Sequence, residues 1–143
     1  MIRLALLIPV NTHGQVLLQH KDSAAPFKPN HWTFFGGSIE DGETPEDAAI
    51  REFKEELQRD IGKQNIGKLN FFGKYVFDEE WGRLEKTFFV IFVNEGSETL
   101  KVDQLEGDNL GFFNYSNSSR LDVSLNDRKV LEDAFKRGFL NLF

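Results

Sequence analysis

The stretch from Gly36 to Leu57 reads Gly-Gly-Ser-Ile-Glu-Asp-Gly-Glu-Thr-Pro-Glu-Asp-Ala-Ala-Ile-Arg-Glu-Phe-Lys-Glu-Glu-Leu. It opens on two glycines, which allow backbone to come close to a ligand. It then has the signals of a helix start, with Thr44 at the N-cap, Pro45 at the first helical position and acidic residues in the first turn. We expect this helix to run from 45 to about 60 and to stop at Gly62.

The expected helix carries three glutamates on one face. At about 100° per residue, Glu56 lies about 40° to one side of Glu52, and Glu55 lies about 60° to the other. Like-charge pairs at this spacing cost roughly 0.2–0.5 kcal/mol each when nothing compensates for them. A hard divalent cation would compensate, because Mg²⁺ prefers carboxylate oxygens and often shares them with substrate phosphates. An acidic helix can also be a solvated face, so the helix alone leaves both interpretations open.

Negative charge is concentrated in this part of the chain. Nine acidic and three basic residues lie between positions 40 and 60, so this segment has a net charge of −6. The net charge of all 143 residues has the same value. The balanced remainder argues against nonspecific binding to long nucleic acid or to an anionic membrane. The absence of Cys excludes disulfides, thiolate metal sites and Cys nucleophiles. The apolar N-terminal segment is short and lacks a clear cleavage site, so we expect a cytoplasmic protein.

Apolar and alternating runs outside the stretch predict strands and one further helix. The expected strands cover 2–10, 15–19, 32–35, 68–77, 86–94 and 110–115, and the expected helix covers 125–139. The strand at 32–35 should stop at the glycine pair. On the first helix, Ile50, Phe53 and Leu57 form a stripe suited to packing on a sheet, and Ala48 and Ala49 leave room for something to approach the acids. Strands mixed with two helices predict a single α/β domain over 1–143, with a sheet covered on both faces.

The spacing of the glycine and the charges resembles the Nudix box. Gly37 is followed by five residues, Glu43, seven residues and then Arg51-Glu52-Phe53-Lys54-Glu55-Glu56. A chance match of these positions is on the order of one in a million. Gln58 stands where the box has a Gly, which affects the exit of the helix but none of the acids. The resemblance implies a Nudix-type α/β/α sandwich, with a mixed sheet between helices.

Nudix enzymes cleave a pyrophosphate linkage in nucleoside diphosphate derivatives, using Mg²⁺ or Mn²⁺. The resemblance implies that Glu52, Glu55 and Glu56 hold the metal ion, helped by the backbone carbonyl of Gly36. It implies that Arg51 pairs with Glu43 or Glu52 and fixes the carboxylates. Together, these groups would neutralise phosphate oxygens, orient a water and stabilise the leaving phosphate.

Other site residues are expected outside the box. Glu106 lies in a loop that resembles the source of a further base or metal ligand in some Nudix members. Its rivals are Asp78, Glu79, Glu80, Glu95 and Glu98. Phe27 and Trp32 are candidates for stacking on the head group of a substrate. Asn126 resembles a base-reading Asn of the oxidised-purine branch, although it could equally cap the last helix.

Four interpretations of function stay open within this resemblance, three of them enzymatic and one of another class. The first is hydrolysis of a nucleoside diphosphate derivative or nucleoside triphosphate, and the second is hydrolysis of an oxidised purine nucleotide of the 8-oxo-dGTP type. The third is action on a capped RNA or a dinucleoside polyphosphate. The interpretation of another class is a non-catalytic nucleotide-binding module. We expect a small-molecule nucleotide as the partner, no membrane and no long nucleic acid, and the apolar C-terminal end could support a homodimer.

Overall fold

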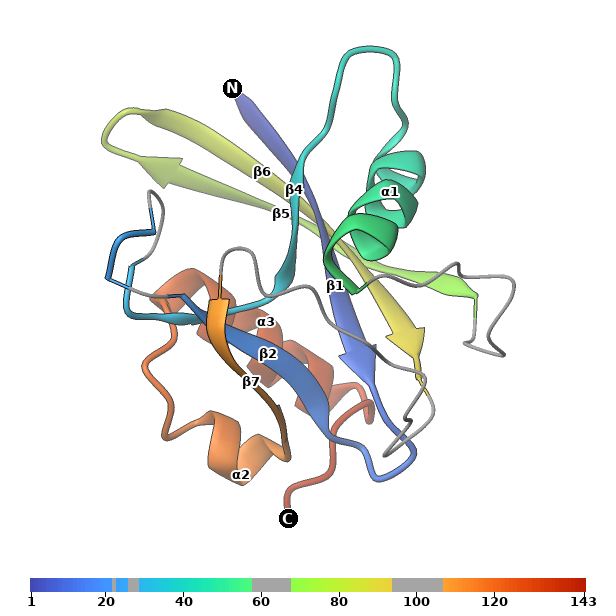
Figure 1. Ribbon diagram of the computed structural model, residues 1–143, viewed down its shortest axis with the longest axis vertical. Helices are drawn as coiled ribbons and strands as arrows, with labels where there is room; N and C mark the ends of the chain where they lie inside the picture. Colours follow the sequence, from blue (N-terminus) through green and yellow to red (C-terminus); the bar gives the residue numbers. More distant parts are fainter. Residues whose placement is uncertain (22, 26–28, 58–67, 94–106) are drawn as a thin grey trace.

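The computed structural model describes residues 1–21, 23–25, 29–57, 68–93 and 107–143. Within them, seven strands and three helices follow one another along the chain (Figure 1). The elements are β1 (Ile2–Val10), β2 (Val16–Lys21), β3 (Trp32–Thr33), β4 (Phe35–Ser38), α1 (Pro45–Leu57), β5 (Leu69–Glu79), β6 (Gly82–Phe92), β7 (Gly107–Phe113), α2 (Tyr115–Ser118) and α3 (Leu125–Lys136). No helix in these ranges is long and apolar enough to cross a membrane.

One mixed sheet organises the fold, with strand β1 at its centre. The order of its main path is β3-β2-β1-β6-β5, and β4 pairs with β1 while β7 pairs with β2. Strand β1 runs parallel to β6 over its whole length and antiparallel to β4. This confirms the central position that the apolar run at 2–10 predicted, since a strand with neighbours on both sides and cover on both faces is apolar throughout.

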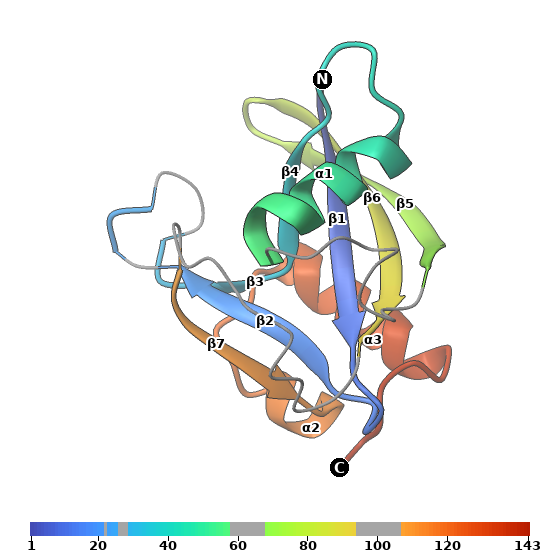
Figure 2. The same ribbon diagram turned by 45° about the vertical axis from the view of Figure 1, so that its right-hand side comes forward.

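Helices cover the two faces of the sheet, as Figures 1 and 2 show, with α1 in front of β1 and α3 behind it. Alternate residues of β1 supply the two cores, because successive side chains of a strand point to opposite faces. Ala5 and Leu7 belong to the core beneath α1, and Leu6 and Ile8 belong to the core beneath α3. The predicted α/β/α sandwich with a mixed sheet is therefore the observed fold.

The segment at 32–38 corrects one detail of the prediction. The expected single strand at 32–35 is two short strands, and the glycine pair lies inside the second of them. Strand β3 pairs with β2, whereas β4 pairs with β1, so the chain changes partner between them. The strand continues through Gly36 because this residue has φ +149°, and a Cβ there would collide with the carbonyl oxygen of Ala5.

The surface of α1 that faces the sheet also differs from the prediction. Ala48, Ala49 and Phe53 are fully buried, while Ile50 is only partly buried. The space beside the two alanines is therefore taken by the sheet, because small side chains allow the helix axis to approach it closely. At the start of the helix, Thr44 accepts a hydrogen bond from the backbone of Asp47 at 3.0 Å, which confirms the N-cap. The predicted stop at Gly62 lies outside the described residues.

Candidate active site

A cavity of about 580 Å³ extends from the acidic side of α1, past the glycine pair, to the face of the sheet beneath α3. Its acidic end is formed by Glu52, Glu55 and Glu56 together with Gly36 and Gly37. Its other walls come from three groups of residues. They are apolar side chains (Ile2, Leu4, Leu6, Phe34, Trp81 and Leu84), uncharged polar residues (Gln19, Thr33 and Ser38) and charged side chains (Lys21, Lys86 and Asp127). A volume of this size suits a small-molecule ligand.

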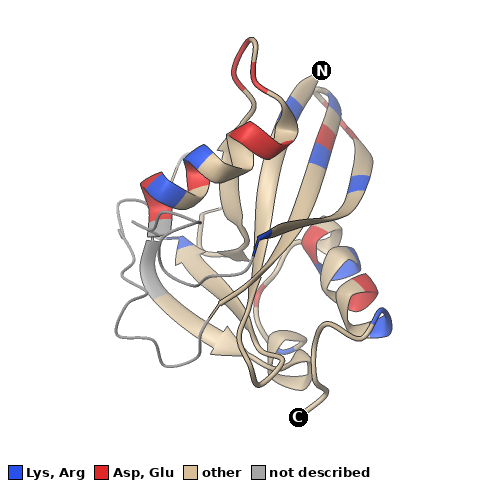
Figure 3. Cartoon of the chain, turned by 90° about the vertical axis from the view of Figure 1, so that its right-hand side faces the viewer, with Lys and Arg blue, Asp and Glu red and all other residues tan. Residues whose placement is uncertain are grey.

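The three glutamates share one face of α1, as their helical spacing predicted, but their burial differs. The side chain of Glu52 is 11% exposed, and that of Glu55 is 58% exposed. Glu56 is half-buried, and its Oε2 atom is shielded from solvent. Figure 3 shows acidic residues along α1 and the loop before it. The focus of negative charge seen in the sequence is therefore a focus in space beside the cavity.

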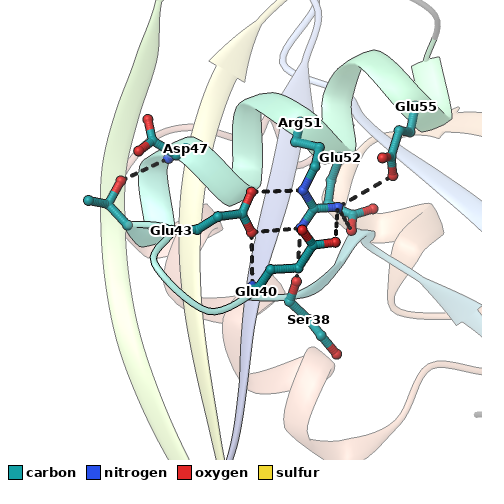
Figure 4. Close-up of polar contacts among 8 residues, drawn as sticks. Ser38, Glu40, Glu43, Asp47, Arg51, Glu52 and Glu55 are labelled. Carbon is teal, nitrogen blue, oxygen red and sulfur yellow. Dashed lines mark hydrogen bonds and ion pairs between the residues drawn. The ribbon is translucent and has the colours of Figure 1, made fainter.

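Arg51 contacts the carboxylates of Glu43, Glu52 and Glu55, as Figure 4 shows. Its Nε and Nη2 atoms donate to the two carboxylate oxygens of Glu43 at 2.8 and 2.9 Å. Its Nη1 atom donates to Glu52 Oε1 at 2.9 Å and to Glu55 Oε2 at 3.4 Å, and Nη2 also donates to the carbonyl of Ser38 at 3.0 Å. A planar guanidinium can make such a fork, whereas an ammonium cannot. Arg51 thus joins the loop, β4 and two of the candidate metal ligands.

The glycine at position 37 makes room for the most buried of the three acids. A Cβ at Gly37 would overlap Oε1 of Glu52 and would lie 2.8 Å from its Cδ atom. The carboxylate of Glu52 therefore rests directly on the backbone of β4. Position 37 therefore favours glycine, because a side chain from α1 closely approaches the strand there.

The bidentate contact changes the charge state of Glu43. The hydrogen bond from Arg51, with a second from the backbone of Glu40, lowers the pKa of Glu43 from 4.5 to about 2. The same contact raises the pKa of Arg51 above its ordinary value. Both groups therefore stay charged at neutral pH.

We predict an acid-dependent loss of stability that Glu43 controls. Because the folded pKa of Glu43 is depressed, the pair stabilises the fold fully above pH 4.5 and loses that contribution as the pH falls toward about 2. Glu43→Gln should lower the melting temperature at neutral pH and flatten its dependence on pH between these values. Thermal melts followed by circular dichroism measure both effects. Glu46→Gln, at an exposed glutamate in the first turn of α1, is the matched control. Equal curves for Glu43→Gln and wild type would contradict the prediction.

The donor set fits a hard divalent cation in chemistry. Carboxylates of Glu52, Glu55 and Glu56 and a backbone carbonyl at Gly36 are oxygen ligands of the kind that Mg²⁺ and Mn²⁺ take. Within the described ranges, no three acidic or histidine side chains already converge as a metal site. Instead, Arg51 Nη1 lies between one oxygen of Glu52 and one of Glu55. The largely exposed side chain of Glu55 can turn toward the cavity at small cost, so the arrangement is compatible with metal binding.

Two further predicted site residues that the structure describes, Trp32 and Asn126, do not line this cavity. Trp32 packs between His20 and Phe113, with ring centroids at 5.2 and 5.1 Å, and is not among the residues that line the cavity. Asn126 donates to Glu79 Oε1 at 3.1 Å and also lies outside the lining. Their roles in substrate binding stay predictions. The N-cap of α3 is Ser124, so the capping role considered for Asn126 is wrong.

Two predicted residues lie outside the part of the chain that the structure describes, namely Phe27 and Glu106. The same holds for Glu95 and Glu98 among the rivals of Glu106. The remaining rivals lie around the β5–β6 turn, where Asp78 forms an exposed ion pair with Arg83 at 3.3 Å. None of these turn acids, Asp78, Glu79 and Glu80, is among the residues lining the cavity.

The prediction from sequence missed Lys86 and Asp127, which form a buried ion pair in the cavity wall. A signal for both was present. Lys86 takes the inward position in the alternation Leu84, Lys86, Phe88, Val90 of β6. Asp127 takes an apolar-face position in the helical series Asp127, Val130, Leu131, Ala134. A charge at an apolar position of a periodic pattern indicates a buried partner of opposite sign.

Comparison with known proteins agrees with the fold. The sequence profile of the NUDIX domain matches residues 2–134. No curated protein sequence matches the chain.

Among solved structures, the dihydroneopterin triphosphate pyrophosphohydrolase of E. coli superposes with a TM-score of 0.78 at 19% identity, covering 95% of this chain and 96% of that one. A MutT protein from Methanosarcina mazei Go1 gives 0.77 at 15% identity, covering 95% and 94%. The Ap4A hydrolase of C. elegans gives 0.72 at 19% identity, covering 96% and 99%. These likenesses support the fold. The profile match over nearly the whole chain shows that this chain belongs to the Nudix family of pyrophosphohydrolases, which act on anhydrides in phosphorus-containing compounds.

Proposed function

We propose that this protein hydrolyses the pyrophosphate bond of a nucleoside diphosphate derivative or nucleoside triphosphate, with Mg²⁺ or Mn²⁺ held by Glu52, Glu55 and Glu56. The partner would be a free small-molecule nucleotide in the cytoplasm, handled by a single domain spanning 1–143. One observation carries the proposal. The three carboxylates open onto a cavity of about 580 Å³ that continues to apolar and aromatic walls. A diphosphate and a head group need such a pair of adjoining environments.

The residues around the cavity have separable roles in this proposal. A bound divalent cation would supply charge neutralisation at the phosphate oxygens and a more acidic water. Arg51 is a positioning residue, because it holds Glu52 and the loop at Glu43 through its hydrogen bonds. Glu55 and Glu56 would complete the ligand set, with the backbone carbonyl of Gly36. Glu106 is proposed as the further base.

A nucleotide panel with and without metal tests the proposal. The panel contains nucleoside triphosphates, 8-oxo-dGTP, a nucleoside diphosphate sugar, Ap4A and dihydroneopterin triphosphate, the last two prompted by the structural neighbours. We expect hydrolysis of at least one compound at a bond between phosphates, with products separated by chromatography. Treatment with EDTA should abolish turnover, and added Mg²⁺ or Mn²⁺ should restore it, because hard cations are the natural partners of this donor set. Turnover that survives exhaustive chelation would contradict the metal-dependent mechanism.

The same panel separates the remaining interpretations. Preference for 8-oxo-dGTP would favour the oxidised-purine interpretation, and Asn126→Ala should then alter base preference more than metal response. Saturable binding of nucleotides without any hydrolysis would favour the non-catalytic module. The crowding of Glu52, Glu55 and Glu56 argues for the enzyme, since a pure binder has no need of three neighbouring acids on one helix face.

A further inference from the structure

The wall of the cavity beneath α3 contains an ion pair in surroundings that are otherwise largely apolar. Lys86 Nζ on β6 lies 2.9 Å from Asp127 Oδ1 on α3, and the two side chains are 6% and 5% exposed. Both residues line the cavity that holds the three glutamates at its other end. Leu4 and Leu84 lie beside them on the same face of the sheet. The pair is therefore desolvated and yet reachable from the cavity.

Stability gives little reason for a charged pair at this place. Removing two charges from water carries a large desolvation penalty, and apolar residues of similar volume are often at least as stabilising as a buried ion pair. The contribution of such a pair is easier to explain if its charges also serve a ligand. The pair also leaves hydrogen-bonding capacity unused within the described part of the chain.

The unused capacity is specific in kind. A lysine ammonium has three donors. Within the described part of the chain, Lys86 uses only one of them in a hydrogen bond, to Asp127, although its Nζ also lies 5.8 Å from the centre of the Phe77 ring. The second oxygen of Asp127, Oδ2, accepts no hydrogen bond from the residues that the structure describes. Thr33 is 7% exposed and lines the same cavity, and its buried Oγ1 has no hydrogen-bond partner among those residues. Buried groups of this kind gain free energy from a ligand that satisfies them.

We propose that Lys86 and Asp127 read the head group of the substrate and select a 6-oxopurine. The two remaining donors of Lys86 match two neighbouring acceptors, and Oδ2 of Asp127 matches a donor beside them. The N7, O6 and N1–H groups of guanine or hypoxanthine present this order, and Lys commonly donates to O6 and N7. Adenine presents its amino donor between two acceptors, which places a donor against the ammonium. The inference rests on the proposed function, because the glutamates must hold the diphosphate at the other end of the cavity.

The surrounding side chains suit the flat faces of such a ring. Trp81, at the β5–β6 turn, lines the cavity and is 52% exposed, so its indole is available for stacking. The ammonium donors of Lys86 also exclude an 8-oxopurine. Oxidation at C8 converts the N7 acceptor into an N–H donor, which would face the ammonium. The head group selected here is therefore an unoxidised 6-oxopurine.

Steady-state kinetics with Mg²⁺ tests the selection. We expect kcat/KM for GTP and ITP to exceed that for ATP by roughly tenfold or more, and that for 8-oxo-GTP by a similar factor. Asp127→Asn should lower the ratio of GTP to ATP, because a neutral amide oxygen is a weaker acceptor for N1–H than a carboxylate. The double variant Lys86→Met/Asp127→Met replaces the pair by apolar side chains and should lose the ratio, which covers the case in which a single variant does not fold. Lys74→Met, an exposed lysine on β5, is the matched control and should keep the ratio.

Binding of nucleoside monophosphates separates this inference from the proposed function. Calorimetry on the wild type should give an affinity for GMP about tenfold or more above that for AMP. The inference would be overturned if the protein hydrolysed GTP and ATP at equal rates and bound GMP and AMP with equal affinities. The proposed function would then still stand. A preference for GMP in a protein that hydrolyses nothing would support the reading of the head group and remove the proposed function.

Discussion

Glu55→Gln is expected to lower kcat at least a hundredfold while the melting temperature stays within a few degrees of the wild-type value. An amide keeps the shape of the side chain but removes the negative charge that a divalent cation requires, and losses of about 100-fold to 1,000-fold are typical when one electrostatic group of this kind is removed. Stability should change little, because the side chain is 58% exposed and its contact with Arg51 is long, at 3.4 Å. Rates with the preferred nucleotide and thermal melts measure the two quantities.

The dependence on metal concentration makes this prediction more specific. If Glu55 is a ligand, the variant should need more Mg²⁺ for half of its maximal rate, since a site with one ligand fewer binds the ion more weakly. Glu46→Gln is the matched control, being an exposed glutamate on the same helix. Glu56→Gln should resemble Glu55→Gln in kinetics. An unchanged kcat for Glu55→Gln would remove that residue from the metal site.

Gly37→Ala is expected to reduce kcat/KM at least tenfold by displacing the carboxylate of Glu52. The added Cβ would overlap Oε1 of Glu52 and lie 2.8 Å from its Cδ atom, so the side chain would have to leave its place on β4. Its hydrogen bond with Arg51, now 2.9 Å long, would be lost or lengthened with it. A misplaced ligand lowers the rate even when the ligand itself is present.

Gly111→Ala provides a matched control for the loss of stability that such a collision brings. A Cβ at Gly111, on β7, would lie 2.8 Å from the ring of Phe113, but Gly111 does not line the cavity. Both variants should melt at lower temperature than the wild type. Only Gly37→Ala should lose activity when rates are compared well below both melting temperatures. Equal activities of the two variants would show that close packing at Gly37 does not position Glu52.

The sequence allowed the local parts of the site to be predicted. The N-cap at Thr44, the helix that follows it and the shared face of the three glutamates depend on residues three or four positions apart, and helical geometry determines their relation. The central apolar strand at 2–10 was recognisable because burial on both faces leaves no polar alternation. The pairing of Arg51 with Glu43 followed from the resemblance to the Nudix box, and the structure confirms it with two hydrogen bonds.

Other features depended on which surfaces meet in the folded chain. Ala48 and Ala49 were expected to leave room beside the acids, whereas the sheet fills that space. The division of 32–38 into two strands arises because β3 and β4 pair with different neighbours, and short-range patterns do not contain that information. Trp32 was selected by residue type and Asn126 by a family resemblance, but the structure places both outside the cavity lining.

By itself, the sequence determined that a capped acidic helix follows a glycine pair, and therefore which groups could bind a divalent cation. Only the tertiary structure decided what lies opposite that helix, because Lys86 and Asp127 are 41 positions apart and meet only when α3 packs on the sheet. The physical reason is that helical periodicity and capping act over a few residues, whereas the walls of a cavity are assembled by strand pairing and by packing between distant segments.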